Sequence, residues 1–260
     1  MAVRARHRVE AAVMGPPTTA YRGHPPGGCS GRLGVARRWP ECQRVVVALT
    51  LLLAACASHP PPPDWQGSAK AATDGSTAAY LEGNERVEAT ELARARSEVA
   101  RTGRADLLAR VELTRCAAEV ASLVFGPCAG FEPLRADAGA AERAYADYLQ
   151  ARIAPQDIAL LPEPQRAVAA GGPSDAANFA ALGAIADPLS RLVAAGVLFE
   201  AGRADPQVIA LAIDTASQQG WRRPLLAWLG VQLKRAELAG ASDEAQRLRR
   251  RIALVQRGGA

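Results

Sequence analysis

The chain has 260 residues and a formal net charge of +5. The first 55 residues contain eight arginines and two glutamates, so the rest carries 23 basic and 24 acidic residues and is nearly neutral. A nearly neutral domain lacks the basic surface that nucleic acids require, and we expect no nucleic-acid partner.

Residues 1–44 are rich in arginine, glycine and proline and show no apolar periodicity. We expect them to form a disordered N-terminal extension. One interpretation is a start codon assigned too early, with translation beginning nearer Arg44. The alternative is a twin-arginine export signal at Arg37-Arg38, although apolar residues do not follow that pair closely.

An uncharged apolar run of eleven residues extends from Val45 to Ala55. A membrane-spanning helix needs about 20 apolar residues, so this run is too short to cross a bilayer alone. Its length and the preceding Arg44 are typical of a signal-peptide core. A buried helix, or an ordinary cleaved signal with an incidental Cys56, is the alternative.

The run ends in Leu53-Ala54-Ala55-Cys56, which resembles the lipobox of bacterial lipoproteins. The resemblance implies that Cys56 receives a diacylglycerol, that the chain is cut before it, and that its new amino group is acylated with a fatty acid such as palmitate. Several acyl chains hold a protein firmly on a membrane. Because Ala57 follows the cysteine, the resemblance implies the periplasmic face of the outer membrane.

Residues 56–83 follow as a predicted tether. The prolines from Pro60 to Pro63 cannot continue a helix, and the stretch from Asp64 to Gly83 is small and polar. We therefore expect the folded domain to occupy residues 84–257.

This domain is predicted to be all-α, because it is rich in alanine and arginine and has no convincing alternation of apolar and polar residues. The first predicted helices span 85–102, 105–125 and 138–153. Four prolines and a double glycine between 154 and 178 favour only short helical turns there.

The C-terminal third carries clear helix signals. Asp187-Pro188 and Asp205-Pro206 are typical helix starts, and Gly202, Gly220 and Gly240 are typical helix stops. The predicted helices span 187–200, 205–219, 221–239 and 242–255. They would form two antiparallel hairpins with a period near 38 residues, and the turn Gly-Arg-Ala-Asp occurs at both 103–106 and 202–205. This layout loosely resembles tetratricopeptide-like α-helical repeat proteins.

Cys116 and Cys128 are the cysteines that follow Cys56. In an oxidising compartment they can pair, because Gly126-Pro127 breaks the helix and lets the chain fold back. The loop-entropy gain would be about 3 kcal/mol. Two inert thiols are the alternative.

Catalytic signatures are missing from the predicted domain. His59 is the only histidine after the apolar run, and there is no C-x-x-C pair or phosphate-binding glycine loop. We therefore predict no catalytic residue, no cofactor and no metal site. A pair of catalytic carboxylates remains open, because surface acids and catalytic acids look alike in a sequence.

Two groups of side chains are candidates for a partner surface. Trp221 and Trp228 lie at helical spacing, either in a binding groove or in the core, and the core interpretation is favoured. Arg247, Arg250 and Arg251 crowd the last helix, either to meet anionic lipid head groups or as its solvated face, and the second interpretation is favoured.

Taken together, the patterns predict a non-catalytic lipoprotein held in the bacterial envelope by lipid on Cys56. Its helical domain would act as a periplasm-facing adaptor or assembly factor for another envelope protein. The alternative is a carboxylate-dependent envelope enzyme, such as a peptidoglycan hydrolase.

Overall fold

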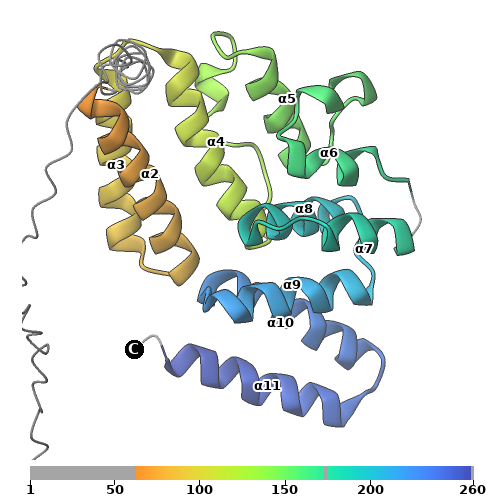
Figure 1. The fold of residues 1–260 in the computed structure, drawn as a ribbon. Helices are drawn as coiled ribbons and strands as arrows, with labels where there is room; N and C mark the ends of the chain where they lie inside the picture. The colour runs from red at the N-terminus through yellow and green to blue at the C-terminus, as the bar shows by residue number, and fades with distance from the viewer. Residues whose placement is uncertain (1–62, 173–174, 259–260) are drawn as a thin grey trace, which may run out of the picture. The chain divides into compact units, whose positions relative to one another are not determined.

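The computed structural model describes residues 63–172 and 175–258, and every regular element within them is helical (Figure 1). The predicted all-α class is therefore confirmed. The predicted lipidation residue Cys56 and the apolar run before it lie outside the described residues.

The first described helix, α2 (Asp64–Glu82), corrects the predicted tether. It forms an antiparallel pair with α3 (Glu85–Ala100), as Figure 1 shows. Its buried residues include Ala69, Ala72 and Ala79, which recur at helical spacing among the small polar residues. Alanine is the strongest helix former, which favours a helix here, and the buried face combines alanines with Tyr80 and Leu81 near the C-terminal end of α2.

The turn between α2 and α3 follows ordinary capping rules. Gly83 ends α2 with a left-handed φ of 81°, a conformation that glycine adopts without steric cost. The side chain of Asn84 then accepts a hydrogen bond from the backbone N–H of Val87 at 3.3 Å and caps α3.

The central helix, α4 (Ala105–Ala121), is shorter than the predicted 105–125. It stops because Leu123 takes a left-handed φ of 60°, with the N–H of Val124 bonded to the carbonyl of Glu119. The next helix, α5 (Ala140–Leu149), is likewise followed by a left-handed residue, Ala151 at φ 53°. Neither Leu123 nor Ala151 is a glycine, so the sequence carried no glycine signal for the end of α4 or of α5.

The middle of the chain consists of short elements, two of which are α-helices longer than the short helical turns predicted for residues 154–178. A 3₁₀ turn, η2 (Glu132–Leu134), lies between α4 and α5. After α5 come η3 (Pro155–Leu160), α6 (Glu163–Ala170) and α7 (Asp175–Gly183).

The C-terminal helices confirm the predicted hairpins. They are α8 (Pro188–Glu200), α9 (Pro206–Gln219), α10 (Arg222–Leu238) and α11 (Ser242–Arg257). Asp187 and Asp205 cap α8 and α9 by accepting hydrogen bonds from Ser190 and Val208 at 2.7 and 2.8 Å.

The main core lies where α4 packs against α8, with α9 and α10 beside them. The two helices approach closely at Gly196, because a Cβ there would lie 2.3 Å from the carbonyl oxygen of Val120. Helix α2 also contacts α10 through Arg223, which donates to the carbonyl of Tyr80 at 2.8 Å. A linear stack of repeats makes contacts only between neighbours, so this pairing of an early and a late helix departs from the predicted repeat pattern.

Candidate functional site

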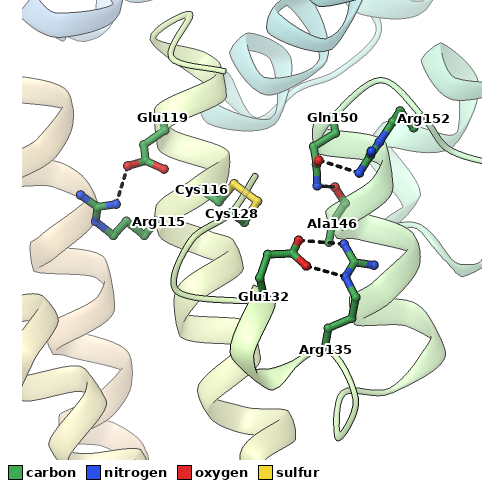
Figure 2. The surroundings of a disulfide bond; sticks show 9 residues. All are labelled: Arg115, Cys116, Glu119, Cys128, Glu132, Arg135, Ala146, Gln150 and Arg152. Carbon is green, nitrogen blue, oxygen red and sulfur yellow. Dashed lines mark hydrogen bonds and ion pairs between the residues drawn. A yellow bond between two sulfur atoms is a disulfide. The ribbon is translucent and has the colours of Figure 1, made fainter. Parts of the chain in front are cut away.

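The two cysteines of the domain form a disulfide. Cys116 lies on α4 and Cys128 in the loop that follows, with a Cα–Cα distance of 5.5 Å (Figure 2). Cys128 and Phe131 are buried, and the Arg135 guanidinium lies 5.1 Å from the centre of the Phe131 ring. The Cys116–Cys128 disulfide therefore fixes the loop onto α4.

The same loop is held by charge. Arg135 donates two hydrogen bonds to Glu132, at 2.9 and 3.0 Å, as Figure 2 shows. Because these bonds favour the ionised carboxylate, the pKa of Glu132 lies below its ordinary value.

The two tryptophans of the candidate partner surface have different positions. Trp228 is fully buried, and its indole N–H donates to the backbone carbonyl of Ala121 at 3.1 Å. The prediction that Trp228 belongs to a partner surface is therefore wrong, and the interpretation that it packs in the core is confirmed. Trp221 is the residue before α10 and is partly buried against Tyr80 and Leu81.

The arginines of α11 are exposed or half-buried. Arg247 pairs with Glu244 at 2.6 Å, and Arg251 donates to the hydroxyl of Ser217 at 3.3 Å. Arg250 and Arg257 are exposed and have no ion-pair or hydrogen-bond partner among the described residues. The outer face of α11 thus presents cations that the domain does not neutralise.

Charge is divided unevenly along the domain. Residues 64–220 contain 14 basic and 21 acidic side chains, whereas residues 221–258 contain nine basic and three acidic ones. The near-neutral total therefore conceals an acidic body joined to a strongly basic α10–α11 hairpin.

The most buried carboxylates are structural. Glu88, Glu112 and Glu142 are each less than a tenth exposed, and each accepts a hydrogen bond from an arginine of another helix. The bonds are Arg115 to Glu88 at 2.9 Å, Arg96 to Glu112 at 2.8 Å and Arg110 to Glu142 at 2.7 Å. A buried charge requires such a partner, so these pairs join α4 to α3 and α5.

One cavity of about 350 Å³ lies between α4, α5 and η3. Arg110, Thr114, Glu142 and Tyr145 contribute its polar groups. Burial raises the pKa of Tyr145, which therefore stays protonated at neutral pH. Glu142 is the one carboxylate that lines it among the described residues.

A larger groove, of about 600 Å³, lies beside α10. Phe199 and Ile209 supply apolar walls from α8 and α9, and Ala227, Gly230 and Val231 form a stripe along α10. Lys234 and Arg235 line it too, and no acid does. The side chain of Ser122, at the C-terminal end of α4, also contributes. The arrangement can bind an apolar group that carries a negative charge.

This groove was missed from the sequence. Gly230 was the one available signal, because a glycine inside a helix without a nearby helix end suggests a packing or functional reason. The opposing residue Phe199 belongs to another hairpin, and its proximity depends on the tertiary fold.

No protein-family model matches the chain, and no curated protein or solved structure is significantly similar to it. Among the described residues no helix is long and apolar enough to cross a bilayer. No group of three or more metal-binding side chains was found there.

Proposed function

We propose that the protein is a non-catalytic lipoprotein of the bacterial outer membrane, anchored on its periplasmic face by lipid on Cys56. Its helical domain serves as an adaptor that binds an acidic envelope protein. The α10–α11 hairpin provides the binding surface, with Arg247, Arg250 and Arg257 on α11. The observation that carries this proposal is the separation of charge between hairpin and body.

Charge separation favours a partner because several cations of the hairpin have no partner within the described residues. An acidic body and a basic hairpin in one small domain steer an acidic partner toward one surface and repel it from the rest. The cations of Arg250 and Arg257 stabilise no contact within the described residues, so they are available to an external carboxylate. Arginine is also enriched where protein interfaces bind most strongly.

The disulfide also agrees with an envelope location. Structural disulfides persist in oxidising compartments such as the periplasm and are rare in the cytosol. Cys116 and Cys128 are bonded to each other, and the described residues contain no group of three or more metal-binding side chains.

The anchor is tested by growing cells with an alkyne-tagged fatty acid and measuring its incorporation into the protein. We expect label on the wild type and on Ser58→Ala, a matched control two residues away, but not on Cys56→Ser. Cys56→Ser should also be released from the membrane fraction. Label retained by Cys56→Ser, or recovery of the wild type in the inner membrane, would contradict the proposal.

A further inference from the structure

We propose that the groove beside α10 binds a single-chain anionic amphiphile, meaning an acyl or alkyl chain that ends in a carboxylate or a phosphate. This goes beyond the adaptor function and does not depend on it, because no residue of α11 lines the groove.

The apolar part of the groove suits a hydrocarbon chain. Ala227, Gly230 and Val231 are three and four residues apart, which places them on one stripe of α10. Phe199 and Ile209 line the groove from other helices. A volume of about 600 Å³ lies within the range of about 300–1,000 Å³ that ligand sites occupy.

Gly230 lies on the exposed part of this stripe. A Cβ at this position would meet no atom within 4 Å, so close packing does not require a glycine. Glycine inside a helix is less stable than alanine, which makes its presence here costly to α10. The space beside Gly230 is therefore available to a ligand.

The charged end of the groove suits an anionic head group. Lys234 lies three residues after Val231 and continues the same stripe, and Arg235 adds a second cation. Neither has an ion-pair or hydrogen-bond partner among the described residues, and both are exposed. A chain lying on the stripe can place its head group on these cations.

Ser122 provides an independent indication of a ligand. This residue is 4% exposed and lines the groove, yet its hydroxyl has no hydrogen-bond partner within residues 63–172 and 175–258. Buried polar groups are almost always hydrogen-bonded, because an unpaired one is destabilising. Because this oxygen is shielded from solvent, a ligand oxygen would accept its hydrogen bond only after a local shift of the groove wall.

The test is photo-crosslinking of the full-length Cys56→Ser variant with a diazirine-bearing palmitic acid, followed by peptide mapping. This variant avoids competition from an attached acyl chain and keeps every other residue. We expect saturable label on the peptides that contain Phe199 and Val231. Unlabelled palmitate and lysophosphatidic acid should each displace it, and the one effective at the lower concentration identifies the preferred head group, whereas neutral monopalmitoylglycerol should not displace it.

Two sets of variants make the result specific. Gly230→Leu should fill the groove and lower labelling at least about tenfold, whereas Gly230→Ala should leave labelling intact; both should melt at or above the wild-type temperature, because each removes a helical glycine. Replacing Lys234 and Arg235 by glutamine should weaken the binding of the fatty acid about tenfold. Arg250→Gln, which lies outside the groove, should leave that binding unchanged.

Equal displacement by the neutral lipid, or unchanged labelling in Gly230→Leu, would overturn the proposal. So would an absence of saturable label on the peptides that contain Phe199 and Val231 in the Cys56→Ser variant. None of these outcomes depends on lipidation of Cys56 or on the outer face of α11.

Discussion

The helices before residue 150 and the hairpins after residue 187 are stabilised in different ways. In the first region, arginine–glutamate pairs and a disulfide join α4 to its neighbours. In the second, α8, α9 and α10 pack around the fully buried Trp228, and aspartate caps begin α8 and α9.

The difference lies in the cross-links, because both regions bury large apolar side chains, among them Tyr148, Phe131 and Leu81 in the first and Trp228, Leu192 and Leu198 in the second. In the first region the ion pairs and the disulfide add to this apolar core and hold α4 to α3, α5 and the following loop. We infer that the first region depends on pH and redox state more than the second.

The largest effect should come from Trp228→Ala. Removing a fully buried tryptophan typically lowers the free energy of unfolding by about 3–5 kcal/mol, and here the Phe199 ring contact at 5.7 Å is lost too. Thermal melts measure the change, with Trp221→Ala as a partly buried control that should cost less. A Trp228→Ala variant that melts like the wild type would refute the apolar account of the second region.

The next effect should come from breaking the disulfide. Replacing Cys116 and Cys128 with serine removes a cross-link over 12 residues, which the loop-entropy relation values at about 3 kcal/mol. Hydrogen exchange should show that backbone amides of the loop and of α4 lose protection before those of α11 do. If α11 loses protection equally, the two regions are not stabilised separately.

A smaller effect should follow Arg96→Met, which leaves the Glu112 carboxylate buried without its partner. We expect a loss of about 2 kcal/mol in the free energy of unfolding, reduced by the partial exposure of Arg96. Adding Glu112→Gln should restore part of this loss, because a neutral amide costs less to bury. Denaturant unfolding of Arg96→Met, Glu112→Gln and the double variant measures these values, and additive losses would argue against the pair.

The smallest effect concerns pH. The pKa of Glu132 is lowered by Arg135, so its contribution to stability is present above the unfolded pKa of about 4.5 and is lost as the pH falls through the folded pKa. Glu132→Gln should flatten the acid side of the stability curve by less than about 1 kcal/mol, since the pair is partly exposed. Identical curves for variant and wild type would remove this pair from the comparison.

The two regions also differed in how well the sequence predicted them. Asp187, Asp205, Gly202 and Gly220 are local signals, because each acts on its own helix end, and the C-terminal helices were placed within about two residues. The end of α4 at Leu123 and the helix α2 were missed. A left-handed leucine gives no sequence signal, and a small-residue helical face resembles a linker.

The candidate site was predicted only in part. The pairing of Cys116 with Cys128 followed from their spacing, and the burial of Trp228 followed from its apolar neighbours. The groove could not be predicted, because Ser122, Phe199 and Gly230 meet only through packing of α4, α8 and α10. The uneven charge was present in the sequence but was hidden by the near-neutral total.

The central claim is that an acidic envelope protein binds the α10–α11 hairpin, and site-specific photo-crosslinking in living cells tests it most directly. A photoreactive residue at Arg250 should give one main protein adduct, whereas the same residue at Lys70, exposed on α2, should not. Changing Arg247 and Arg257 to glutamate should abolish the adduct. An adduct at Lys70 alone, or one at Arg250 that survives charge reversal, would contradict the account.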